Sequence, residues 1–256
     1  MVILPLYQAV YATAAANFTQ TDYFALMKDG RVRAMDMALG FPSYSPERRQ
    51  ICGISVKGEK DYVGRCALKM TEEPPELVFT LSNSRILYPA ASPDNQKIAF
   101  IEQEIGEEKG TLRIIQREEF GWFPVQIRFP ASLLPVAWGS GDTILFTGED
   151  GALYVTPLDR RGRPVKVDDA GLMPASHSGT KRLAFVQGRE IVFLGDIRIR
   201  IEAGDVSALS FSNDGASLLF AVTDNGHYQA RRVALESREI SPVCEASARI
   251  VMVSEI

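Results

Sequence analysis

The two histidines are the side chains best suited to acid–base catalysis or metal binding, because imidazole titrates near neutral pH and is a common metal ligand. His177 lies in a predicted turn between two strands, whereas His227 follows the predicted strand from Leu218 to Thr223. The two ends of a strand of this length are about 20 Å apart. We therefore predict that the histidines share neither a catalytic dyad nor a metal ion. His177 is expected to be a structural turn residue, and His227 an exposed loop residue.

A group of four glutamates could bind a cation or a partner. The four are Glu102, Glu104, Glu107 and Glu108, in a predicted hairpin loop that also contains glycines. Weak binding of calcium would require the backbone to fold around the ion, and the stretch lacks the alternating Asp and Asn spacing of a calcium loop. We interpret it as a solvated acidic loop and as a candidate surface for a partner.

Sequence motifs of common enzyme sites are missing from the chain. It contains no G-x-S-x-G nucleophile elbow, no H-E-x-x-H metal helix, no phosphate-binding G-x-x-x-x-G-K and no dinucleotide-binding G-x-G-x-x-G. We accordingly predict no catalytic residue, no metal and no cofactor. The sequence favours a binding protein over an enzyme.

Three aromatic residues lie close together in one predicted connection between strands. They are Phe120, Trp122 and Phe123. Aromatic side chains clustered on a surface are typical of protein contact sites. The alternative is that they fold inward and pack under the rim of the domain. The sequence leaves both interpretations open.

Three cysteines cannot all pair within one chain. If the hairpin between residues 52 and 66 turns at Gly58-Glu59-Lys60, Cys52 and Cys66 lie directly opposite each other, within disulfide range. Packing alone also explains two small apolar residues there, and Cys244 is left over. We favour three reduced thiols and a cytoplasmic chain.

The elements that position these residues are read from one repeated stretch. Residues 86–100, ILYPAASPDNQKIAF, contain an apolar run, a turn and a second apolar run, which predicts two short strands joined by a tight turn. Altered copies follow the spacing of five anchor residues, Ser45, Ser92, Gly139, His177 and Ser212. The anchors are 47, 47, 38 and 35 residues apart. A period of this size, with about four short strands per unit, predicts a propeller blade.

Two of these copies carry a resemblance to a known family. The phrases YPAASPDNQKIAF and ALSFSNDGASLLF resemble the WD40-like propeller repeats of TolB-type proteins, which also occur in the propellers that cap prolyl-oligopeptidase-like hydrolases. The resemblance covers roughly residues 41 to 245. It implies the fold, and protein binding as the commonest role of such propellers, more strongly than any activity.

The repeats predict a single all-β domain over residues 1–256, a six-bladed β-propeller of four-stranded antiparallel blades. Five blades are expected at about 41–81, 82–130, 131–169, 170–202 and 203–245. Ser254 lies 42 residues past Ser212, where a further repeat is due, and the chain stops there. We therefore predict that residues 1–40 and 246–256 together form the sixth blade, which closes the ring and removes its open edge.

Composition excludes some partners and leaves the compartment open. The net charge of −4 argues against nucleic acid, which needs clustered Lys and Arg, and no apolar run is long enough to enter a membrane. Residues 1–17 have three interpretations: a secretion signal, a strand that closes the ring, or a short Ala-rich helix. We predict a cytoplasmic protein, with a periplasmic location as the alternative if residues 1–16 act as a signal peptide.

These observations predict a non-catalytic propeller that binds another protein, as an adaptor, inhibitor or assembly factor. The candidate contact residues are the three aromatics and the four glutamates. The alternative is a small hydrolase or lyase whose site lies in the central funnel. The partner's identity and the oligomeric state cannot be read from the sequence.

Overall fold

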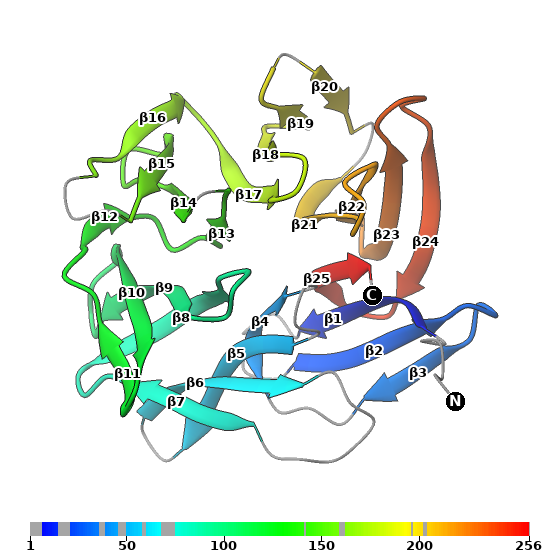
Figure 1. The fold of residues 1–256 in the computed structure, drawn as a ribbon. Helices are drawn as coiled ribbons and strands as arrows, with labels where there is room; N and C mark the ends of the chain where they lie inside the picture. The colour runs from blue at the N-terminus through cyan, green and yellow to red at the C-terminus, as the bar shows by residue number, and fades with distance from the viewer. Residues whose placement is uncertain are drawn as a thin grey trace.

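The computed structural model is a ring of β-sheets (Figure 1). It describes residues 7–14, 21–35, 39–45, 50–57, 60–67, 75–140, 142–158, 162–195, 197–201 and 204–255. Within these ranges the chain forms 25 strands in six sheets. The predicted all-β, six-bladed propeller is confirmed.

The blades are named I to VI, and the strand that faces the centre of the ring is given first in each. Blade I consists of β25 (Arg249–Glu255), β1 (Tyr7–Ala14), β2 (Thr21–Met27) and β3 (Val32–Met35). Blade II consists of β4 (Gly40–Ser45), β5 (Gln50–Lys57), β6 (Lys60–Ala67) and β7 (Glu76–Thr80). Blade III consists of β8 (Ser84–Ala91), β9 (Lys97–Glu104), β10 (Gly110–Glu118), β11 (Gly121–Pro124) and β12 (Phe129–Ala131).

The other three blades have four strands each. Blade IV consists of β13 (Ala137–Trp138), β14 (Thr143–Thr147), β15 (Leu153–Pro157) and β16 (Val165–Asp168). Blade V consists of β17 (Leu172–His177), β18 (Arg182–Gln187), β19 (Glu190–Phe193) and β20 (Ile197–Arg200). Blade VI consists of β21 (Asp205–Phe211), β22 (Ser217–Asp224), β23 (His227–Ala234) and β24 (Ile240–Ala246).

The two ends of the chain close the ring within blade I. Strand β25 pairs antiparallel with β1, with Val10 opposite Ser254 and Ala12 opposite Met252, and Figure 1 shows the two strands side by side. The predicted sharing of one blade by both termini is therefore confirmed. Residues 7–14 are a strand, so the helix interpretation is wrong for them, while residues 1–6 and 15–17 lie outside the described ranges.

The second strand of each repeat supplies the core. Phe100, Phe146, Phe185 and Phe220 occupy equivalent places on β9, β14, β18 and β22, and each is at most 2% exposed. They fall on the apolar positions that follow four of the five predicted turns. Burying an aromatic ring of this size contributes about 2 to 3 kcal/mol. The repeated phenylalanine therefore explains why the repeat is visible in the sequence.

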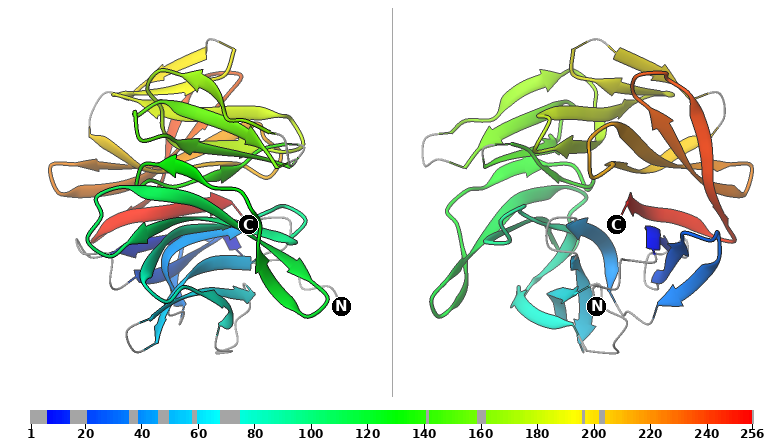
Figure 2. Two further views of the ribbon diagram at one scale, coloured as in Figure 1. Left: turned by 90° about the vertical axis from the view of Figure 1, so that its left-hand side faces the viewer. Right: turned by 45° about the vertical axis from the view of Figure 1, so that its right-hand side comes forward.

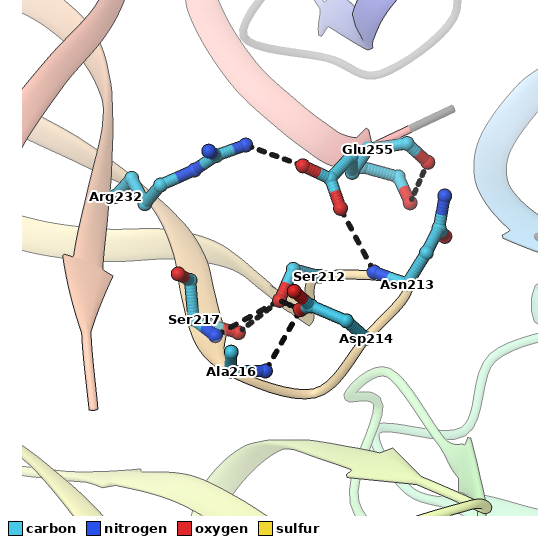
Figure 3. Close-up of polar contacts among 8 residues, drawn as sticks. Ser212, Asn213, Asp214, Ala216, Ser217, Arg232 and Glu255 are labelled. Atoms are coloured by element: carbon cyan, nitrogen blue, oxygen red, sulfur yellow. Dashed lines mark hydrogen bonds and ion pairs between the residues drawn. The ribbon is translucent and has the colours of Figure 1, made fainter. Parts of the chain in front are cut away.

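The predicted turn residues hold the tight turns by hydrogen bonds. In blade VI, the hydroxyl of Ser212 donates to the Asp214 carboxylate at 2.7 Å, and the amide of Ser217 donates to the Ser212 hydroxyl at 2.9 Å (Figure 3). Blade III repeats the arrangement with Ser92 and Asp94 at 2.6 Å. A serine followed two residues later by aspartate therefore satisfies the turn locally, as such side chains commonly do.

Side chains of the inner strands bond the backbone of the neighbouring blade. The hydroxyl of Ser43 donates to the carbonyl of Pro89 at 2.6 Å, which joins blade II to blade III. The indole of Trp138 donates to the carbonyl of Ala90 at 2.7 Å, which joins blade IV to blade III. Similar bonds run from Ser176 to Trp138, from Ser207 to Ile250 and from Ser210 to Val253. These bonds satisfy carbonyls that would be costly to bury unpaired.

The outer part of blade III is divided between two strands. Val125, Ile127 and Phe129 alternate with polar residues as in a strand, yet β11 ends before this stretch and β12 begins at its end, both paired with β10. The amide of Ile127 donates to the carbonyl of Val125 at 2.8 Å, which is the bond of a three-residue turn. This turn interrupts the strand.

Candidate functional site

The predicted aromatic connection is the tip of a hairpin. Glu118 at the end of β10 lies opposite Gly121 at the start of β11, so the loop consists of Glu119 and Phe120 alone. Figure 2 shows this hairpin, in green, extending outward from the ring. Phe120 is 87% exposed, and Phe123, on β11, is 44% exposed. We call Phe120 and Phe123 the hairpin aromatic pair.

Trp122 takes the opposite orientation. Alternation along β11 turns it toward blade II, where the guanidinium of Arg65 lies 4.8 Å from the centre of its ring. Trp122 is partly buried against a core cluster that includes Val63 and Ile115. The two interpretations of the aromatic group thus apply to different residues: Trp122 folds inward, and Phe120 and Phe123 face solvent.

Arg65 contacts the face of the Trp122 ring and is itself held by two polar partners. Its side chain is 5% exposed, and its guanidinium donates to Glu76 at 2.7 Å and to Asn95 at 3.0 Å. A buried guanidinium is stable only when it is paired and hydrogen-bonded. The stacked Trp122 and these two partners hold the base of the hairpin against the neighbouring blade.

The acidic stretch is partly misassigned by the sequence. The sequence predicts Glu102 in a loop, and this is wrong: Glu102 lies within β9, opposite Thr111, and its side chain is 14% exposed. It forms an ion pair with Arg113 and accepts a hydrogen bond from Ser84 at 3.0 Å. Glu102 therefore has a structural role, because its partners Arg113 and Ser84 lie on neighbouring strands of the same sheet.

The other three glutamates lie where a partner could reach them. Glu104 ends β9, and Glu107 and Glu108 lie in the turn before β10; all three are exposed. We call them the acidic turn. It lies at the end of β10 opposite to the hairpin aromatic pair, because the two connections follow opposite ends of that strand.

The two histidines lie in different blades, V and VI, and next to turns at opposite ends of the strands. His177 ends β17, where its Nδ1 contacts the Thr180 hydroxyl at 2.9 Å and its Nε2 contacts the Asn213 carbonyl at 3.0 Å. His227 begins β23, opposite Asp224, and is exposed. Among the described residues, no group of three or more His, Cys, Asp or Glu is placed to hold a metal ion.

The cysteines differ from their predicted register by one residue. Cys52 lies opposite Arg65, and Cys66 opposite Ile51. The reason is the hairpin connection: Lys57 pairs with Lys60, so the loop has two residues instead of three. The side chain of Cys66 lies outside the described part of the chain. Burial raises the pKa of Cys244 to about 11, which keeps this thiol protonated at neutral pH.

A cavity of about 590 Å³ lies on the axis of the ring, bounded by the inner strands of all six blades. Its size is within the range of small-molecule sites. The sequence prediction names no residue of this cavity as a binding residue. Its lining is mostly apolar, with His177 and Arg249 among its polar members.

Solved structures resemble this arrangement. TolB from Acinetobacter baumannii superimposes with a TM-score of 0.73 at 13% identity, covering 97% of this chain and 66% of that one. The chain has the fold of a TolB-type six-bladed β-propeller. No protein-family model matches the sequence, and no curated protein matches it.

Two further solved structures, one from a protein complex and one of an enzyme, resemble the chain. A chain of the nidogen–laminin complex matches with a TM-score of 0.64 at 10% identity, covering 97% of each chain. The periplasmic gluconolactonase of Pseudomonas aeruginosa matches with a TM-score of 0.55 at 14% identity, covering 94% of this chain and 83% of that one. At these identities the likeness shows the propeller fold alone.

A sequence signal for the central cavity does exist. Phe41, Tyr88 and Met173 each precede a proline and lie four residues before a repeat anchor. All three adopt positive φ, at 46°, 51° and 50°, and all three line the cavity. A bulky residue before proline strongly disfavours this backbone region, so the conformation is strained. Strain of this kind clusters at functional sites.

The strain arises from the same bulge in three inner strands. Gly40 and Ser43 are three residues apart on β4, whereas their partners on β5, Ile54 and Cys52, are two apart. Strands β8 and β17 show the same one-residue excess around Tyr88 and Met173. A bulge redirects the side chain of the bulged strand.

Within the described residues, no helix is long and apolar enough to cross a membrane.

Proposed function

We propose that this TolB-type propeller is a non-catalytic binding module that holds another protein through the hairpin aromatic pair. The observation that carries the proposal is the 87% exposure of Phe120 at the tip of a two-residue turn, with Phe123 close by in sequence on β11. Phenylalanine is among the aromatic residues that are enriched at protein interfaces relative to the rest of the surface.

The base of the hairpin supports this role because it is rigid. Trp122 and Arg65 fix β11 to blade II, so binding would order few additional side chains. Preorganisation of this kind raises affinity, since less conformational entropy is lost on association. The fold also occurs in a chain of the nidogen–laminin complex, which is an assembly of proteins.

The edge of blade III offers a second means of attachment. Strand β11 is the outermost strand of its sheet and pairs with β10. An extended segment of a partner can pair with such an edge while its side chains contact the hairpin aromatic pair. A hydrolase or lyase in the central cavity is supported less, because both ring nitrogens of His177 already contact Thr180 and Asn213.

The test is a comparison of captured proteins between variants. The wild-type chain and the double variant Phe120→Ser, Phe123→Ser are each used to capture partners, which mass spectrometry quantifies. The control is Val165→Ser, because Val165 is 60% exposed on the strand β16 of another blade. We expect a partner that the wild type and the control retain and the double variant loses. Equal capture by all three would refute the proposal.

A further inference from the structure

The central cavity has the composition of a ligand site, independently of the proposed protein contact. The strained residues Phe41, Tyr88 and Met173 project from three separate blades into its lining. The rings of Phe41 and Tyr88 meet edge to face with their centres 4.9 Å apart. The same strained bulge recurs in three blades, and such strain persists only where the surrounding structure fixes it.

The polar groups of the lining include several serines and one charged side chain. The hydroxyls of Ser43, Ser207 and Ser210 donate to carbonyls of the neighbouring blade. These serines therefore join adjacent blades of the ring. Arg249, at the start of β25, is exposed and borders the cavity. Among the described lining residues it carries the one permanent charge, and Asp and Glu do not contribute to the lining.

Tyr88 links the apolar and the charged parts of the lining. Burial raises the pKa of its hydroxyl, and the charge of Arg249 acts against that rise. The hydroxyl is therefore protonated at neutral pH and able to donate a hydrogen bond, and the Arg249 guanidinium, which lines the same cavity, can donate several.

We propose that the central cavity binds a small organic acid with a single carboxylate on an apolar body. Arg249 and the hydroxyl of Tyr88 bind the carboxylate, and Phe41 and Met173 contact the apolar body. Arginine suits this role because its planar fork of donors matches the two oxygens of a carboxylate. The volume of about 590 Å³ accommodates an acid of the size of a substituted aryl butyrate.

The first test compares acids with alcohols of the same shape. Binding of 1-pyrenebutyrate and 4-phenylbutyrate to the full chain is measured by isothermal titration at pH 7, each beside its own alcohol, 1-pyrenebutanol or 4-phenylbutanol. We expect at least one acid to bind about 10- to 100-fold more tightly than its alcohol, which is the factor that a hydrogen bond to a charged group gives. If neither acid binds more tightly than its alcohol, the proposal is wrong.

The second test locates the binding site. Arg249→Gln should weaken binding of the acid about 10-fold or more and leave binding of the alcohol unchanged, and Tyr88→Phe should weaken binding of the acid roughly 3- to 10-fold. The control is Arg200→Gln, because Arg200 is exposed on β20, away from the cavity lining. Melting curves check that each variant folds. Equal loss in the control, or no loss in Arg249→Gln, would place the acid elsewhere and overturn the assignment.

Discussion

The guanidinium of Arg65, on β6, lies 4.8 Å from the ring centre of Trp122, on β11. This contact joins the third strand of blade II to the outer strand β11 of the neighbouring blade III. It also separates the three aromatics of the hairpin into one structural residue and two exposed ones. Substitution of Trp122 should therefore change the stability of the fold, whereas substitution of Phe120 or Phe123 should change the binding of a partner.

Substitution of Trp122 tests the structural role. Trp122→Ala should lower the free energy of unfolding by about 2 to 4 kcal/mol, since the side chain is partly buried and stacks on Arg65. Phe120→Ala should change it by less than about 0.5 kcal/mol, because Phe120 is exposed. Urea denaturation of both variants checks the difference. Equal stability of Trp122→Ala and the wild type would show that the indole makes no stabilising contact.

Removal of β25 tests the closure of the ring. Deleting residues 249–256 removes the innermost strand of blade I and exposes its partner β1. It also removes Glu255, which accepts hydrogen bonds from the amide of Asn213 at 2.9 Å and from Arg232 at 2.6 Å (Figure 3). Thermal melting should lose its cooperativity. A truncated chain that melts within about two degrees of the full one would contradict closure by β25.

The repeat and the closure of the ring could be predicted because their signals are local. Ser92 with Asp94, and Ser212 with Asp214, form the same turn, and a phenylalanine is buried at the same distance after each. A turn and an alternating strand need no knowledge of distant contacts. The period of the repeat then fixes the number of blades.

The remaining features depend on register between strands, which the sequence does not reveal. Glu102 looks like a loop residue until β9 is known to reach Glu104, which places its carboxylate beside Arg113. The opposite orientations of Trp122 and Phe123 follow from a strand that begins at Gly121, one residue after the turn. A two-residue loop between Lys57 and Lys60 likewise shifts the cysteines by one position.

The turn aspartates should make stability depend on acid pH. The hydrogen bond from Ser212 and the amide of Ala216 hold the pKa of Asp214 below its ordinary value. For Asp94 burial acts to raise the pKa, but the bond from Ser92 contributes to a net lowering. A carboxyl with a lowered folded pKa stabilises the fold above the unfolded pKa of about 4, and this stabilisation disappears as the pH falls through the folded value.

The corresponding measurement is denaturation of the wild type and Asp214→Asn between pH 7 and pH 3. The wild type should lose more stability than the variant over this range, because the variant has no carboxylate to protonate at that turn. Asp205→Asn removes an exposed carboxyl on β21 and serves as the control. Parallel losses in the wild type and in Asp214→Asn would exclude a contribution from this turn.

The cysteines should all be thiols. Three groups are expected to react with a thiol reagent in denaturant without prior reduction, because Cys52 and Cys66 are one residue out of the directly opposed register that favours a disulfide. A spectrophotometric count checks this. A count of one would mean that two of the three cysteines are bridged, and would indicate an oxidising compartment.

The most direct test of the proposed function is hydrogen exchange of the protein with and without its captured partner. The proposal predicts protection of residues 118–124, which form the tip of the hairpin with Phe120 and Phe123, and unchanged exchange of residues 104–109 in the acidic turn. These segments lie at opposite ends of β10, so one compact partner surface protects one of them. Protection of residues 104–109 with unchanged exchange at 118–124 would contradict binding through the hairpin aromatic pair.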